Sequence, residues 1–161
     1  MKTYRFRDDW HVDASPEQVW ALISQPETYP KWCSVYQEAR VTKGTGGVGT
    51  EAVFKFRVLL PYNLSLTSTV TRSEPPHIAE GKVSGELDGT WRWTLEPERG
   101  GTLVIFEEAV TTNKWFLDLL SPIAYKLFEL NHHIWAKRSA EGMRSYFAGQ
   151  ANSDGSGVQS S

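Results

Sequence analysis

The sequence predicts an α+β domain in which a curved antiparallel sheet of about seven strands wraps around one long C-terminal helix, with two short helices after the first strand. Three observations support this fold class. Residues 35–113 alternate apolar and polar side chains between turn signals, which is typical of a run of strands. No helix long enough for a parallel crossover lies among them, so the sheet should be antiparallel. Only the last helix is long enough to cover the apolar face of such a sheet.

The first strand and the two short helices are predicted from the N-terminal 32 residues. Tyr4 to Val12 alternates aromatic or aliphatic residues with charged ones, and Asp8 is an exception that falls on the aromatic side. Ser15-Pro16-Glu17-Gln18 has the form of a capping box with proline at the first helical position. Pro26 ends that helix, and Glu27 to Trp32 has room for only one more short turn.

The central strands are predicted from the turn signals that separate them. A strand from Ala52 to Leu60 follows a glycine-rich turn, and another runs from His77 to Leu87. Asp88-Gly89 is a strong hairpin signal. The other turn signals are Gly44 to Gly49, Pro61-Tyr62-Asn63, Pro75-Pro76 and Arg99-Gly100-Gly101.

The long helix is expected to begin at Ser121 and to end at Gly149, with Pro122 in its first turn. At 100° per residue one face collects most of the large apolar side chains. Asn131 and Arg138 lie in the middle of that face, two turns or roughly 10 Å apart. They either line a pocket or are paired structurally beneath the helix. The apolar members of the face are Leu120, Ala124, Leu127, Phe128, Ile134, Trp135, Gly142 and Tyr146.

Length, composition and charge limit the kinds of protein that this chain can be. Residues 1–149 are expected to form one domain, and the weakly apolar tail 150–161 is expected to be disordered. The formal charge is −2 with no basic run, which argues against nucleic-acid binding. The N-terminus does not resemble a signal peptide, and the most apolar window, residues 115–130, is interrupted by charges and proline, so no transmembrane segment is expected. The single cysteine, Cys33, allows a reducing compartment, and a cytoplasmic location is expected. The oligomeric state is left open.

A sheet wrapped around one helix leaves space between them, and aromatic side chains make up 12% of this chain. The expected pocket is apolar with a few polar groups and binds a hydrophobic small molecule. Its expected ligand-binding residues are Phe54, Phe56, Leu66, Trp91, Trp93, Phe106, Glu108, Leu127, Asn131, Ile134, Trp135 and Arg138. Its expected mouth residues are Trp32, Tyr36, Tyr62, Trp115 and Phe116.

Five short motifs carry a resemblance to a known family: Ala14-Ser15-Pro16-Glu17-Gln18-Val19-Trp20, Tyr29-Pro30-Lys31-Trp32, Gly47-Val48-Gly49-Thr50, Gly100-Gly101-Thr102, and Asn131-His132-His133 with Glu141-Gly142-Met143. With the order of elements, they resemble the helix-grip fold of the START-related, birch-pollen-allergen-like (SRPBCC) superfamily. More narrowly the chain is similar to bacterial polyketide cyclase/dehydrase-type proteins. The resemblance covers about residues 3–148 and implies the fold and a cavity. The superfamily includes lipid carriers, hormone receptors and cyclases and shares no catalytic residue set, so it implies no residue roles.

Glu108 and Arg138 are the candidate catalytic residues, although neither is assigned. Glu108 shares strand parity with Val104 and Phe106, so an inward carboxylate with a raised pKa is one expectation and a solvated strand end is the other. Arg138 either binds a polar group of the ligand or pairs with an inward acid such as Glu108 or Asp8. Asn131 has the same choice between the ligand and the backbone. Gly142 is expected to allow close approach of the helix to the sheet.

Other chemistries have little support in the sequence. The adjacent His132 and His133 diverge by about 100° on a helix and cannot chelate one metal, so neither a metal nor a cofactor is predicted. Cys33 has no visible base partner, and the turn at Gly44 to Gly49 lacks the lysine of a phosphate-binding loop.

Three hypotheses remain. The first is a non-enzymatic binder of a lipid, an isoprenoid or quinone-like molecule, or an aromatic polyketide-like molecule. The second is an aromatase/cyclase-like or dehydratase-like enzyme that uses acid–base groups in the same cavity. The third is a protein-interaction module built on the aromatic residues around Trp115. Titratable groups beside free cavity volume would favour the enzyme, and a filled interior would favour the interaction module.

Overall fold

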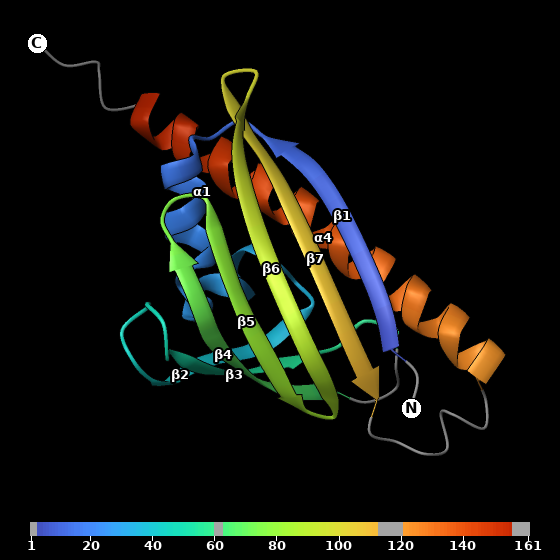
Figure 1. Ribbon diagram of the computed structural model, residues 1–161. Helices are drawn as coiled ribbons and strands as arrows, with labels where there is room; N and C mark the ends of the chain where they lie inside the picture. The colour runs from blue at the N-terminus through green and yellow to red at the C-terminus, as the bar shows by residue number, and fades with distance from the viewer. Residues whose placement is uncertain (1–2, 60–62, 113–120, 156–161) are drawn as a thin grey trace, which may run out of the picture.

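The computed structural model describes residues 3–59, 63–112 and 121–155. Figure 1 shows the sheet in front of the long helix α4, which crosses behind it diagonally. The elements in chain order are β1 (Thr3–Val12), α1 (Pro16–Ile23), the 3₁₀ turn η1 (Pro26–Thr28), α2 (Tyr29–Trp32), β2 (Tyr36–Lys43), β3 (Glu51–Phe56), β4 (Leu64–Glu74), β5 (Ile78–Gly85), β6 (Leu87–Glu98), β7 (Gly101–Thr112) and α4 (Ser121–Gly155).

The sheet is antiparallel throughout, and its seven strands have the order β1-β7-β6-β5-β4-β3-β2. Every neighbouring pair is consecutive in the chain except β1 and β7, which bring the first and last strands together. The predicted helix-grip fold is therefore confirmed, with a seven-stranded sheet, short helices after β1 and one long C-terminal helix. The predicted capping box is also present, since Ser15 Oγ accepts from the Gln18 amide and Gln18 Oε1 accepts from the Ser15 amide.

Two strand boundaries differ from the prediction. The turn between β5 and β6 lies at Gly85 and Glu86, and Asp88-Gly89 lies inside β6, where Gly89 pairs with Val110. Gly85 has φ of 128°, a conformation that side-chain-bearing residues rarely adopt. At Gly89, by contrast, a Cβ atom would lie 2.1 Å from the Ala109 carbonyl oxygen, so glycine serves close strand approach there. β3 ends at Phe56, before the expected Leu60, which lies outside the described residues.

The end of α4 also differs. The helix continues past Gly149 to Gly155, so the expected stop at Gly149 is wrong and residues 150–155 are helical. Gly149 does not adopt a positive φ, and the Ser153 hydroxyl donates to its carbonyl oxygen at 3.0 Å. Gln150 donates to the Tyr146 hydroxyl at 2.9 Å, one turn away. These contacts carry the helix through a position where glycine often ends one.

The buried face of α4 is rotated from the predicted one. Arg138 is exposed, and so are Leu127 and Leu130, at 36% and 50%. Part of the predicted face is buried as expected, since Ala124, Asn131 and Trp135 are buried, whereas Leu127 and Arg138 at its other side are exposed. The inner face is built from smaller side chains and aromatic rings, because the helix lies close to its neighbours. The buried residues of α4 are Ala124, Asn131, His132, Trp135, Ala136, Ser139, Ala140, Met143 and Phe147.

Gly142 marks the closest approach of α4 to another element. A Cβ atom there would lie 1.8 Å from the carbonyl oxygen of Trp32 at the end of α2. The close approach expected at this glycine is present, but to α2 and not to the sheet. Trp32 is itself buried, at 6% exposure, and packs in the main core cluster.

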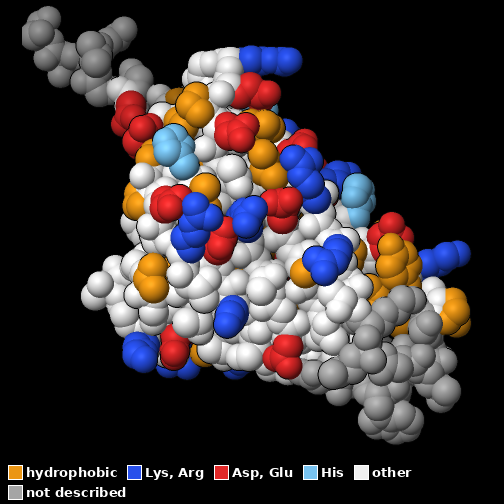
Figure 2. Space-filling view, in the orientation of Figure 1, with side chains coloured by type: hydrophobic (Ala, Val, Ile, Leu, Met, Phe, Trp, Pro, Cys, Tyr) orange, Lys and Arg blue, Asp and Glu red, His pale blue; other side chains and the backbone are white. Residues whose placement is uncertain are grey.

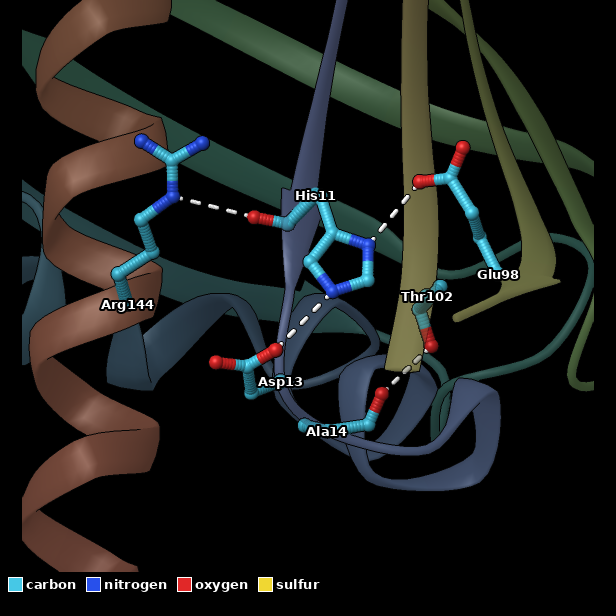
Figure 3. A network of polar contacts seen from close by, with 6 residues as sticks. All are labelled: His11, Asp13, Ala14, Glu98, Thr102 and Arg144. Carbon is cyan, nitrogen blue, oxygen red and sulfur yellow. Dashed lines mark hydrogen bonds and ion pairs between the residues drawn. The ribbon is translucent and has the colours of Figure 1, made fainter. Parts of the chain in front are cut away.

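A polar network joins α4, the sheet and α1 at the end of β1 (Figure 3). Arg144 of α4 donates to the His11 carbonyl oxygen at 3.1 Å, and the His11 ring contacts Glu98 and Asp13 at 3.0 Å each. Thr102 donates to the Ala14 carbonyl oxygen at 2.7 Å. These bonds fix where the chain turns from β1 into α1.

The outer face of the sheet carries charges of both signs (Figure 2). Glu107 contacts Arg7 at 3.8 Å and Arg92 at 3.9 Å, and Glu80 contacts Arg92 at 2.9 Å and Arg72 at 3.0 Å. Alternating signs produce no basic field of the kind that attracts a phosphate backbone. Within the described part of the chain, no helix has the length and apolar character to cross a membrane.

Candidate functional site: a cavity between the sheet and the long helix

A cavity of about 180 Å³ lies between the inner face of the sheet and α4. Its wall is mostly aromatic and aliphatic, and it takes residues from both hydrophobic clusters of the core. Each of the seven strands contributes aliphatic or aromatic side chains to the wall. From β2 that contribution is its first residue, Tyr36. Apart from the tryptophans, nine described wall residues have polar side-chain atoms: Ser24, Tyr29, Tyr36, Thr50, Ser68, Ser73, Glu108, Asn131 and His132.

Most of the predicted ligand-binding residues line this cavity. Leu127, Ile134 and Arg138 do not, because they lie on the outer side of α4. The nine that do are Phe54, Phe56, Leu66, Trp91, Trp93, Phe106, Glu108, Asn131 and Trp135. Their role in binding a ligand stays a prediction.

The predicted mouth residues have mixed outcomes. Tyr36 lines the cavity. Trp32, the last residue of α2, is buried in the main core cluster and is not part of the wall, and its backbone carbonyl packs against Gly142 of α4. Tyr62, Trp115 and Phe116 lie outside the described residues.

The most polar part of the site is a cluster of Asp8, His132 and Glu108, hereafter the acid–histidine cluster. His132 Nδ1 contacts Glu108 Oε1 at 2.7 Å, and its Nε2 contacts Asp8 Oδ2. His132 is 9% exposed, and each carboxylate side chain is 24% exposed. The imidazole therefore joins α4 to β1 and β7 through both of its ring nitrogens.

Strand register brings the two carboxylates together. Phe6 of β1 pairs with Glu108 of β7, and Asp8 pairs with Phe106. The two acids thus occupy one diagonal of an inward-facing square and the two phenylalanines the other. The His132 ring lies over this square and stacks on Phe6, with centroids 4.2 Å apart and planes 8° apart.

The carboxylates keep His132 protonated. Burial by itself lowers the pKa of His132, but the hydrogen bonds to Asp8 and Glu108 and their negative charges outweigh it and raise the pKa from 6.5 to about 9. At neutral pH the ring is an imidazolium that donates to both acids. In one of the two alternatives for Arg138 that residue pairs with these acids, and His132 occupies that position instead.

Glu108 is the member of the cluster that faces the cavity together with His132. One of its carboxylate oxygens contacts the imidazolium, and no described residue forms a hydrogen bond or ion pair with the other. A carboxylate can accept several hydrogen bonds, so this oxygen can accept one from a molecule inside the cavity. The inward parity of Glu108 and the misplaced Asp8 were visible in the sequence, whereas His132 was missed as their partner.

Three other polar wall groups are engaged with the protein. Trp135 Nε1 donates to the Tyr36 hydroxyl at 3.0 Å, and Trp91 Nε1 donates to the Ser68 hydroxyl at 2.9 Å. Asn131 Oδ1 accepts from the backbone amide of Leu59 at 3.0 Å, which is the structural role expected as one of its two alternatives. Burial raises the pKa of Tyr36 well above its ordinary value, so its hydroxyl stays protonated.

Metal and thiol chemistry find no support at this site. Among the described residues no group of three or more histidine, cysteine, aspartate or glutamate side chains is arranged to hold a metal ion. Both ring nitrogens of His132 already contact carboxylates. Cys33 is buried, and its burial raises the pKa of the thiol, so a reactive thiolate is disfavoured.

The comparisons with known proteins agree with this architecture. Residues 3–143 match the model of a family described as polyketide cyclase / dehydrase and lipid transport. The comparison with curated proteins gives no match.

Solved structures with a similar fold include the Zhui aromatase/cyclase from Streptomyces sp. R1128, with a TM-score of 0.77 and 11% identity over 90% of this chain and 93% of that one. A START superfamily protein from Mycobacterium smegmatis has a TM-score of 0.73 and 15% identity over 89% and 98%. The di-domain ARO/CYC BexL from the BE-7585A biosynthetic pathway has a TM-score of 0.73 and 16% identity over 89% of this chain, which spans only 49% of BexL. At these identities the likeness establishes the fold alone.

Proposed function

Because the chain belongs to the polyketide cyclase / dehydrase and lipid transport family, we propose that it binds a compact hydrophobic small molecule in the cavity between the sheet and α4. The observation that carries this proposal is the cavity itself, which has an aromatic wall and a single charged end. Apolar walls with a few placed polar groups are typical of small-molecule sites. The open interior also counts against the interaction-module hypothesis, which required a filled one.

The size of the cavity favours a ring system over a long acyl chain. An apolar cavity of roughly 150 Å³ is enough to hold benzene, and drug-sized ligands occupy roughly 300–1,000 Å³. At about 180 Å³ the cavity has room for one or two fused rings. Aromatic wall residues such as Trp93, Phe106 and Trp135, whose ring centroids lie 4.6 to 6.3 Å apart, offer flat apolar surfaces for such a molecule.

A neutral fluorescent probe tests this proposal. Naphthalene should bind the purified protein and change its fluorescence, and Ala79→Phe should abolish the change, because Ala79 lines the cavity and a phenyl ring there would fill it. The matched control is Ala109→Phe, which adds the same ring in the groove on the outer face of the sheet. Equal fluorescence in the two variants would place the probe outside the cavity and contradict the proposal.

An acid–base enzyme is the second candidate, and one observation favours it: Glu108 lines the cavity, and among the described residues only one of its carboxylate oxygens has a partner. With His132 holding its other oxygen, Glu108 is oriented to remove a proton next to a carbonyl group. If it does so, 2-tetralone in D₂O should exchange its activated hydrogens faster with the protein than without it. Glu108→Gln should remove that acceleration and Glu107→Gln on the outer face should not. An unchanged exchange rate with wild-type protein would leave the binder as the function.

A further inference from the structure

The charged end of the cavity carries a net negative charge. Asp8 and Glu108 contribute two negative charges and protonated His132 one positive charge, so the acid–histidine cluster carries a formal charge of −1. Both donors of the imidazolium are directed at the carboxylates and are not available to a ligand. Among the described wall residues, no lysine or arginine supplies another cation. An anionic ligand would therefore meet an uncompensated negative charge in an apolar space.

The charged end of the cavity can accept a hydrogen bond from a ligand. The second carboxylate oxygen of Glu108 has no hydrogen-bond or ion-pair partner among the described residues. The Tyr36 and Ser68 hydroxyl oxygens already accept hydrogen bonds from tryptophan N–H groups. Each hydroxyl can still donate its own O–H to a ligand, but as an uncharged donor. A hydrogen bond to a carboxylate is about twice as strong as one between neutral groups. The strongest polar contact that a ligand can make in this cavity is thus to donate a hydrogen bond to Glu108.

We propose that the ligand is an aromatic or polycyclic alcohol or phenol whose hydroxyl group donates to Glu108, and that the cavity discriminates against carboxylic acids. This inference rests on the binding function proposed above and names its ligand class. An amine is the less suitable donor, because an ammonium group carries three donors and needs several acceptors once it is removed from water. A hydroxyl needs only one acceptor and matches the single open oxygen.

Three naphthalene derivatives of similar size separate the alternatives. At neutral pH 2-naphthol carries a hydroxyl donor, 2-methylnaphthalene carries none, and 2-naphthoate carries a negative charge. Calorimetric or fluorescence titration of the wild-type protein should show 2-naphthol binding roughly tenfold to a hundredfold tighter than 2-methylnaphthalene, as expected for a hydrogen bond to a charged group. 2-Naphthoate should bind at least about tenfold more weakly than 2-methylnaphthalene.

Two glutamate variants locate the effect. Glu108→Gln removes the charge inside the cavity, so the advantage of 2-naphthol should fall to the few-fold level of a neutral hydrogen bond and the penalty on 2-naphthoate should shrink about tenfold. Glu107→Gln removes a charge from the next residue, which contacts Arg7 and Arg92 on the outer face, and should leave all three affinities unchanged.

The outcomes distinguish this inference from the function on which it rests. Equal binding of 2-naphthol and 2-methylnaphthalene to the wild-type protein, or tightest binding of 2-naphthoate, would overturn the ligand class while leaving a binding cavity. If no derivative bound and naphthalene fluorescence were insensitive to Ala79→Phe, the binding function itself would be refuted and this inference with it.

Discussion

Raising the pH from 6.5 to 9 should weaken the fold, because it removes the proton that His132 holds between Asp8 and Glu108. The imidazolium is 9% exposed and joins α4 to two strands through both of its nitrogens. Once neutral, the ring keeps one N–H and can donate to only one of the two carboxylates. The other carboxylate then loses its partner at a half-buried position.

The sign and size of the effect follow from the raised pKa. The folded protein holds the His132 proton up to about pH 9, whereas the unfolded chain releases it near 6.5. The folded state therefore binds more protons between these values, and stability falls as the pH rises through them. The contribution is fully present below pH 6.5 and is lost by about pH 9, and at about 1.4 kcal/mol per pKa unit it amounts to roughly 3 kcal/mol.

Urea denaturation across this pH range measures the effect. The free energy of unfolding of the wild-type protein should fall more steeply than that of His132→Gln, which cannot titrate. The difference between the two isolates His132 from His11, whose pKa is raised by its hydrogen bonds to Glu98 and Asp13 and which adds a slope of the same sign. His133→Gln, at the exposed neighbouring position, should keep the wild-type slope.

Parallel slopes for the wild-type protein and His132→Gln would refute the reasoning. The comparison should stop at pH 9, because burial raises the pKa values of Cys33, Tyr29 and Tyr36 above ordinary values of 9 to 10, so these groups add their own loss of stability at higher pH. The nitrogen chemical shifts of the His132 ring provide a second measurement, and a midpoint near 6.5 would contradict the raised pKa.

Four further substitutions test the packing and the polar contacts of α4. Gly142→Ala should destabilise the fold by about 1–3 kcal/mol in urea denaturation, because its methyl group would meet the Trp32 carbonyl oxygen. Gly149→Ala should stabilise the helix by up to about 1 kcal/mol, because no atom lies within 4 Å of the added methyl group. Equal effects of the two substitutions would contradict the close approach at Gly142. Arg138→Leu should leave the affinity for naphthalene within about twofold, since this residue is exposed and outside the cavity. A tenfold loss would restore the ligand contact that was one of its two expected alternatives. Asn131→Leu should cost roughly 1–3 kcal/mol of unfolding free energy, because the amide in the loop after β3 loses its acceptor, and an unchanged stability would show that this hydrogen bond contributes little.

The fold could be predicted because its evidence is local. Strand alternation, turn residues and the capping box at Ser15 each report the conformation of a few neighbouring residues, and only one arrangement covers the resulting sheet with one helix. The inward side chains of β3, β4, β6 and β7 followed from the same alternation, which is why residues such as Phe54 and Trp91 were placed correctly on the cavity wall.

The acid–histidine cluster could not be predicted in full, because it depends on the rotation of α4 and on a pairing between distant strands. An inward position was one of two alternatives for both Glu108 and Asp8. Their proximity follows from the pairing of β1 with β7, whose register the sequence does not contain. His132 was missed because the predicted face of α4 is rotated from the buried one and includes exposed Leu127 beside buried Trp135. The alanines and the serine of the buried face give little hydrophobic signal, although small residues are what a closely packed helix face requires.

Native mass spectrometry of the freshly purified protein, followed by denaturation and identification of what is released, tests most directly whether the space between the sheet and α4 holds a compact hydrophobic molecule with a hydroxyl group at Glu108. We expect one equivalent of a one- or two-ring alcohol or phenol, or an empty protein that takes up one equivalent of added 2-naphthol. Release of a long-chain fatty acid, or an empty protein that takes up none of the added 2-naphthol, would contradict it.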